Sequence, residues 1–176
     1  MDLFDTIFEL IDMRSFSNLW FWIMLAILWS SVSHWVIGVP WDMVVRARRR
    51  EEEQTIEDLH DLVRVNCNRI LLISDEVGLI LCGVLCFTLT TLVLLGFYYD
   101  NEFSQAVYLL ASPMILLGLL SVRSARVIRR DGLMGEALYR RLSWHRIVTQ
   151  AIGLVSIFVT AVWGMLQNYT SGALGG

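Results

Sequence analysis

The sequence contains no lysine, only two prolines and only three cysteines, and charged residues make up just 18% of its 176 positions. Three cysteines are too few for a disulfide-stabilised scaffold. The net charge of −3 argues against a nucleic-acid-binding protein, which needs a basic surface. Hydrophobic residues account for 56% of the chain, against about 45–50% in soluble domains. The composition therefore excludes a disordered chain and favours a membrane protein of one domain, residues 1–176.

Sequence motifs typical of catalytic and ligand-binding sites are also missing. There is no glycine-rich phosphate loop, no nucleophile elbow and no pair of histidines at zinc-binding spacing. His34 is the only side chain of the Asp, Glu, Arg and His types inside a predicted membrane span, and such a histidine more often hydrogen-bonds a neighbouring helix than binds a cofactor. We therefore expect no catalytic residue, no metal site and no cofactor, and the sequence favours a protein that is not an enzyme.

Long apolar stretches predict an all-α fold. A bilayer core about 30 Å thick is crossed by roughly 20 apolar residues in a helix. Four stretches meet this length, and we predict a four-span transmembrane helical bundle with the spans 16–39, 77–99, 103–122 and 147–166. The first 15 residues alternate apolar and acidic side chains at helical spacing, which predicts a helix lying flat on the outer membrane surface.

The arginines predict the orientation of the spans. Six lie between the first and second spans and seven lie at or between the third and fourth, which leaves only Arg14 elsewhere among the 14. Cytoplasmic loops of membrane proteins are enriched in basic residues. The segments 42–76 and 123–146 are therefore expected to be cytoplasmic, as helical extensions of spans two and three. Both termini are then expected on the outer, periplasmic side.

A heptad pattern runs through the first cytoplasmic segment. Apolar residues at alternating spacings of three and four, with one polar member, form a seam made of Ile56, Leu59, Val63, Asn66, Ile70 and Ile73. A buried asparagine in such a seam can specify register or partner number. Two interpretations remain open: the seam packs against the chain's own helices, or it binds another copy or another protein.

An ion pair is expected where the second span leaves the membrane. The second and third spans form a hairpin around Asn101, and equal distances from that turn bring two acidic residues beside two basic ones. The predicted members are Asp75, Glu76, Arg123 and Arg126.

Two stripes of small residues follow the spans at intervals of three or four. The stripe in span two consists of Ser74, Gly78, Cys82, Cys86 and Thr90, and the stripe in span four of Gly153, Ser156, Thr160 and Gly164. Small residues allow helices to approach closely in lipid. The stripes therefore predict tight helix packing, and the alternative is that their hydroxyl groups line a narrow pore between several subunits.

The opening run MDLFDTIFELIDMRSFSNLWFW, the run SHWVIGVPWDMVVRARR and residues 57–66 resemble a group of small multi-span membrane proteins of alphaproteobacteria. Members of this group are often labelled components of the Suf iron–sulfur assembly complex. The resemblance implies a bacterial inner-membrane location and carries over no catalytic residue.

Together these patterns predict a non-enzymatic accessory or assembly subunit. It would act through helix packing and through the cytoplasmic seam, and the alternative is a homo-oligomeric ion channel with a Ser/Thr-lined pore. The expected partners are the lipid bilayer and either further copies of the chain or a larger membrane complex. No nucleic acid is expected.

Overall fold

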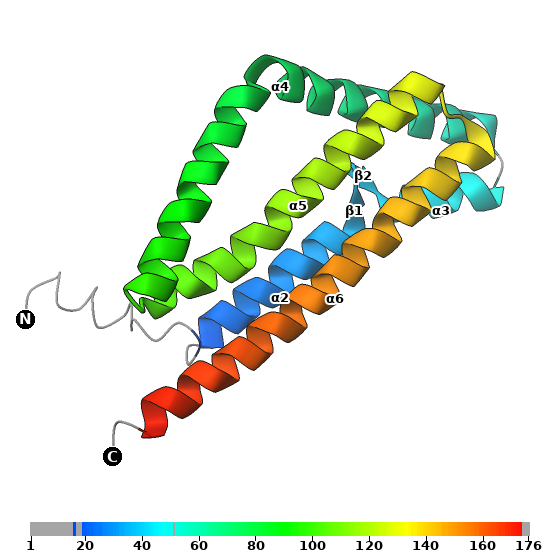
Figure 1. The fold of residues 1–176 in the computed structure, drawn as a ribbon. Coiled ribbons are helices and arrows are strands. Elements are labelled where there is room, and N and C mark those ends of the chain that lie inside the picture. The colour runs from blue at the N-terminus through cyan, green and yellow to red at the C-terminus, as the bar shows by residue number, and fades with distance from the viewer. Residues whose placement is uncertain (1–15, 17–18, 51, 174–176) are drawn as a thin grey trace, which may run out of the picture.

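The computed structural model describes residues 16, 19–50 and 52–173, and these residues are almost entirely helical (Figure 1). The elements follow in the order α2 (Leu19–His34), β1 (Trp35–Val36), β2 (Val39–Pro40), α3 (Trp41–Arg50), α4 (Glu53–Val93), the π-helix η2 (Leu94–Tyr98), α5 (Glu102–Asp131) and α6 (Gly135–Ala173). The predicted surface helix at residues 1–15 lies outside the described residues.

Three of the described helices are long and apolar enough to cross a membrane: 53–98, 102–131 and 135–169. The first predicted span, 16–39, is wrong in extent, because α2 has only 16 residues and is about 24 Å long at 1.5 Å per residue. A two-stranded antiparallel ribbon follows it, with Trp35 opposite Pro40 and Val36 opposite Val39. The described residues therefore contain three helices of membrane-spanning length and one shorter apolar helix.

The ribbon ends α2 because its two turn residues adopt left-handed backbone conformations. Ile37 has φ +53° and Gly38 has φ +74°, as the central residues of a tight hairpin turn require. This conformation is rare for a β-branched residue such as Ile37. Residues 35–40 therefore turn the chain sharply instead of continuing the helix.

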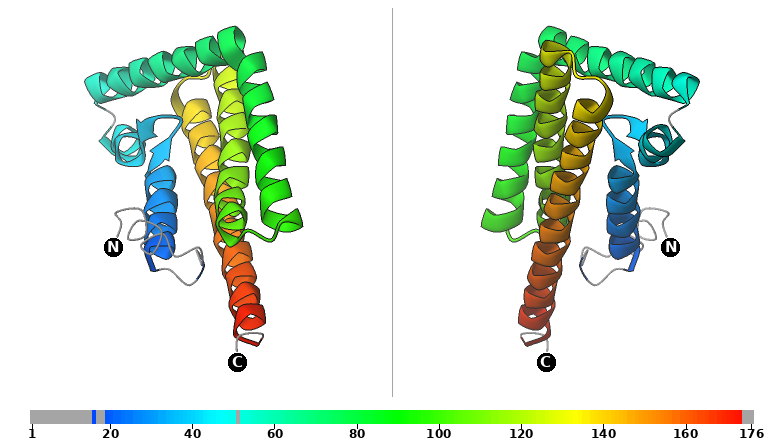
Figure 2. Two further views of the ribbon diagram at one scale, coloured as in Figure 1. Left: turned by 90° about the vertical axis from the view of Figure 1, so that its left-hand side faces the viewer. Right: turned by 90° about the vertical axis from the view of Figure 1, so that its right-hand side faces the viewer.

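Helix α4 is continuous but strongly bent (Figures 1 and 2). Its first part crosses the end of the bundle, and its second part runs back alongside α5. Residues 53–93 form one helix, so the segment before span two continues into that span without a break, but with a change of direction that the sequence did not predict. Packing sets the direction of the first part of α4, because Leu59 and Val63 are buried against residues of the ribbon, α3 and α6.

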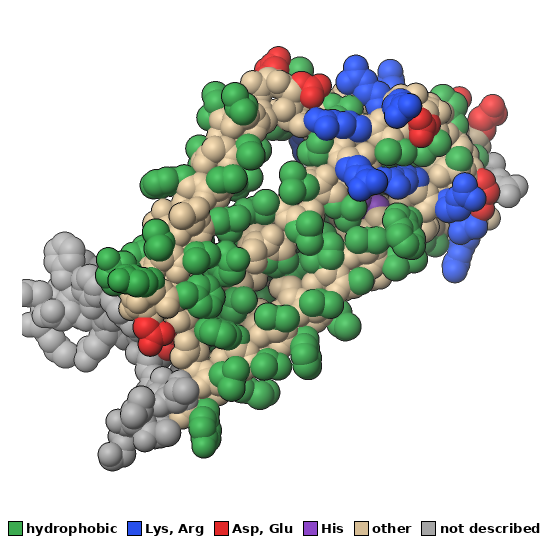
Figure 3. Space-filling model, viewed as in Figure 1, with side chains coloured by type: hydrophobic (Ala, Val, Ile, Leu, Met, Phe, Trp, Pro, Cys, Tyr) green, Lys and Arg blue, Asp and Glu red, His purple; other side chains and the backbone are tan. Residues whose placement is uncertain are grey.

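The main hydrophobic core lies at the end of the molecule where the arginine side chains gather, here called the arginine-rich end (Figure 3). Its fully buried members include Val36, Val39, Leu59 and Leu142. A smaller cluster around Leu25, Trp29 and Leu117 lies between α2, α5 and α6. The apolar parts of the long helices expose many large side chains, as expected for surfaces that face lipid.

Arginine side chains gather at one end of the molecule (Figure 3). The first turn of α2 and the last turn of α6 both lie toward the opposite end (Figure 1). This separation of charge along the long helices makes one end polar and basic and leaves the middle apolar.

Candidate functional site

The small-residue stripe of α6 is filled by α2. Gly153 and Gly164 are buried, and a methyl group added at Gly153 would lie 2.7 Å from Cε3 of Trp29. Ser156 and Thr160 lie on the same face and are also buried. This stripe therefore serves helix packing within the chain, and its hydroxyl groups are not free to line a pore.

We expect Gly153→Ala to lower the free energy of unfolding by about 1–3 kcal/mol, because the added methyl group overlaps the Trp29 ring. Thermal unfolding in detergent, followed by circular dichroism, measures the change. Gly118→Ala is the matched control, since a methyl group there meets nothing within 4 Å. Equal melting temperatures of the two variants would contradict the close packing of α2 on α6.

The corresponding stripe of α4 is left uncovered by the chain. Ser74 and Gly78 are partly exposed, and Cys82, Cys86 and Thr90 are exposed. The Thr90 hydroxyl donates to the Cys86 carbonyl oxygen at 2.8 Å, so it is satisfied within its own helix. None of the most apolar stretch of α4 is buried, whereas 28% of the corresponding stretch of α6 is. This exposed stripe is the candidate docking surface of the protein.

The cytoplasmic seam is occupied by the chain itself. Leu59, Val63 and Asn66 are buried, Ile56 and Ile70 are partly buried and packed on the main core, and only Ile73 is exposed. Of the two interpretations, the structure shows packing within the chain. Most of the seam is therefore covered by the chain's own core, and Ile73 is its exposed member.

Asn66 connects the seam to the ribbon. Its amide Nδ2 donates to the carbonyl oxygen of Gly38 at 3.0 Å. A methyl group added at Gly38 would lie 3.1 Å from Cγ of Asn66, so only glycine fits this contact comfortably. The polar member of the heptad thus holds the turn of the same chain.

Two of the four predicted ion-pair residues, Asp75 and Arg126, form a pair. Nη2 of Arg126 lies 3.8 Å from Oδ1 of Asp75 and donates to the hydroxyl of Ser74 at 3.3 Å. Both side chains of the pair are more than 60% exposed, so the pair contributes at most about 1 kcal/mol. Glu76 and Arg123 form no ion pair with any described residue.

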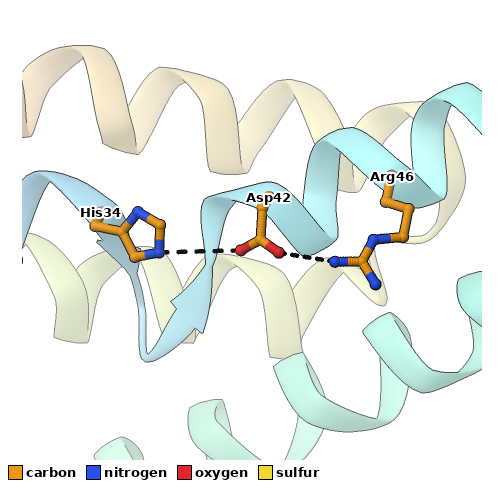
Figure 4. A network of polar contacts seen from close by, with 3 residues as sticks. All are labelled: His34, Asp42 and Arg46. Atoms are coloured by element: carbon orange, nitrogen blue, oxygen red, sulfur yellow. Dashed lines mark hydrogen bonds and ion pairs between the residues drawn. The ribbon is translucent and has the colours of Figure 1, made fainter.

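His34 faces an acidic side chain at the end of α2. Its Nε2 lies 3.9 Å from Oδ1 of Asp42, and Nη2 of Arg46 donates to the other oxygen of Asp42 at 2.9 Å (Figure 4). In the part of the chain that the structure describes, no three His, Cys, Asp or Glu residues gather as metal ligands would.

Gln105 is a buried polar residue that the sequence analysis missed. Its Nε2 donates to the carbonyl oxygen of Gly96 at 2.8 Å and to Oδ1 of Asp100 at 3.1 Å. Its Oε1 accepts from Nε1 of Trp163 at 2.9 Å and from Nε2 of Gln167 at 2.5 Å. One side chain thereby joins η2, α5 and α6. A lone amide inside the predicted span 103–122 was the available signal, because such a group is costly in lipid unless it is bonded.

His145 is buried at the arginine-rich end. It lies before the apolar stretch 147–166, and α6 is long enough to cross a bilayer without this first part. The hydroxyl of Ser124 is 3.1 Å from Nδ1 of His145 and accepts from Arg141. Burial and the nearby Arg141 guanidinium lower the pKa of His145 to about 4. The imidazole is therefore neutral at pH 7.

We expect the fold to lose stability as the pH falls from about 6.5 to about 4, because the unfolded chain protonates His145 in this range and the folded chain does not. The contribution is on the order of 1 kcal/mol. Melting temperatures of wild type and His145→Gln at pH 7 and pH 5 isolate it, since all other groups titrate in both proteins. If the melting temperature falls equally in the two proteins between pH 7 and pH 5, His145 is not the group responsible.

Comparison of the chain with protein-family models, with curated proteins and with solved structures found no match.

Proposed function

We propose that this chain is a non-enzymatic assembly subunit of a bacterial inner-membrane complex. It binds a transmembrane helix of a partner through the exposed stripe Ser74, Gly78, Cys82, Cys86 and Thr90 on α4. One observation carries the proposal: the same type of stripe on α6 is filled by a helix of the chain itself, whereas the stripe on α4 is open. Helices associate in lipid by close packing of this kind.

The proposed orientation places the arginine-rich end in the cytoplasm and both termini in the periplasm, in agreement with the positive-inside rule. A reporter enzyme that is active only in the periplasm should therefore work when fused after Gly176 and fail when fused after Glu53. The reverse pattern of activity would contradict the proposed topology.

The docking surface is tested by adding bulk to it. We expect Cys82→Phe to reduce recovery of the partner in mild detergent by about tenfold or more, because the larger side chain separates the two helices. Val84→Phe is the matched control, since Val84 is exposed on the opposite side of α4. The native mass of each purified complex and its subunit composition are the measurements.

Three outcomes have distinct meanings. One copy of the chain in a larger complex that Cys82→Phe disrupts and Val84→Phe does not would support the proposal. A closed ring of identical copies would instead support the homo-oligomeric channel. A monomer in native lipid, or equal effects of both variants, would rule out a docking role for this face of α4.

A further inference from the structure

An open groove of about 460 Å³ lies where the end of α2 meets α6, at the arginine-rich end of the molecule. Its lining consists of Ser30, Ser31, Ser33, His34, Trp35 and Arg146. Hydroxyl groups and a single cation dominate this lining, and the groove is separate from the proposed docking stripe on α4.

Arg146 provides a cation without a counter-ion. Its guanidinium lies 4.5 Å from the centre of the Trp41 ring, which holds it in place. Its Nε is buried and has no hydrogen-bond partner, and the side chain forms no ion pair with any residue in the described ranges. By contrast, Arg46 and Arg48 are paired with carboxylates. The groove therefore presents a positioned positive charge.

The serine hydroxyls add uncharged hydrogen-bond donors around this charge. Asp42 lies 3.9 Å from Nε2 of His34 in the lining, but its carboxylate accepts a hydrogen bond from Nη2 of Arg46, so its charge is already paired (Figure 4). The carbonyl oxygens that end α2 carry a partial negative charge, which the full charge of Arg146 outweighs. Guanidinium and hydroxyl donors together are the groups that bind phosphate oxygens.

The groove also borders the apolar part of α6. Arg146 directly precedes the apolar stretch 147–166, and Trp35 is 53% exposed beside it. Tryptophan is typical of the membrane–water interface, where lipid headgroups lie. We infer that this groove binds a phosphate group, carried either by a membrane phospholipid or by a soluble anion.

The test uses the full chain purified in detergent and titrated with three probes. Dioleoylphosphatidylglycerol carries the phosphate, dioleoylglycerol has the same tails without it, and sodium phosphate supplies the free anion. Native mass spectrometry counts bound lipid, and the melting temperature reports binding of each probe. The variants are Arg146→Met, which removes the charge, and Arg49→Met, which removes an exposed arginine outside the groove.

We expect wild type and Arg49→Met to bind one phosphatidylglycerol that Arg146→Met binds at least about tenfold more weakly, as for the loss of a charged hydrogen bond. Stabilisation by sodium phosphate alone, abolished by Arg146→Met, would identify a soluble anion as the source. Stabilisation by dioleoylphosphatidylglycerol but not by sodium phosphate would identify the lipid headgroup as the source.

Equal binding of dioleoylglycerol, or equal affinities of Arg146→Met and wild type, would overturn the inference. If Arg146→Met fails to fold, the same titrations are made with Ser31→Leu. This substitution fills the groove from an exposed position and leaves the charge of Arg146 intact. This variant should melt like wild type without lipid and should lose the phosphate-dependent stabilisation. Retained stabilisation in Ser31→Leu would overturn the inference equally.

Discussion

Gln105→Leu will lower the free energy of unfolding by about 3 kcal/mol. The substitution removes four hydrogen bonds, each worth roughly 1 kcal/mol, and leaves the indole N–H of Trp163 without its acceptor. The loss falls where η2, α5 and α6 meet, so the end of the bundle near Asn101 should loosen first. Denaturant unfolding in detergent micelles measures the free energy, and hydrogen exchange locates the loosened segment.

Gln150→Leu is the matched control, because Gln150 is an exposed residue of α6. This control should change stability by less than about 0.5 kcal/mol. If both variants unfold at the same denaturant concentration, the amide of Gln105 is not the connection between the helices that the structure shows.

Asn66→Leu will destabilise the fold by about 2 kcal/mol without changing the number of subunits. The substitution removes the hydrogen bond to Gly38 and leaves a partly buried carbonyl group without its donor. It also places a branched side chain where Gly38 approaches closely. Because the ribbon turn depends on this contact, cleavage by a protease near residues 35–40 should become faster.

Asn68→Leu is the control for this change, since Asn68 is exposed two residues further along α4. Native mass spectrometry of both variants beside wild type gives the subunit number. A change of subunit number in Asn66→Leu alone would mean that the seam meets another copy, in contrast to its burial within the chain.

The sequence by itself determined the class of the protein and the position of its long helices. The hairpin around Asn101 forms as predicted, with Oδ1 of Asn101 accepting from the backbone N–H of Ser104 at the start of α5. These features could be predicted because hydropathy and helix capping are local properties. In lipid, the backbone must satisfy its hydrogen bonds within each segment, so an apolar stretch of sufficient length is helical.

The two stripes of small residues show a feature that the local sequence does not determine. Both place small residues at intervals of three or four, and this pattern does not distinguish the stripe that α2 covers from the one that remains open. The difference arises from Trp29, which reaches Gly153 from a helix more than a hundred residues earlier in the chain. The packing of α2 on α6 covers the stripe of α6 and leaves the stripe of α4 exposed.

Tertiary structure also decided where the first apolar stretch stops and how α4 bends. Residues 35–39 continue the apolar composition of the predicted span, but Ile37 adopts a left-handed conformation in a turn held by Asn66, 28 residues beyond Gly38. The bend of α4 follows from burial of Leu59 and Val63 against elements on both sides of it in the sequence. Composition predicts that a segment is helical, whereas contacts between distant residues decide where the helix ends and which way it runs.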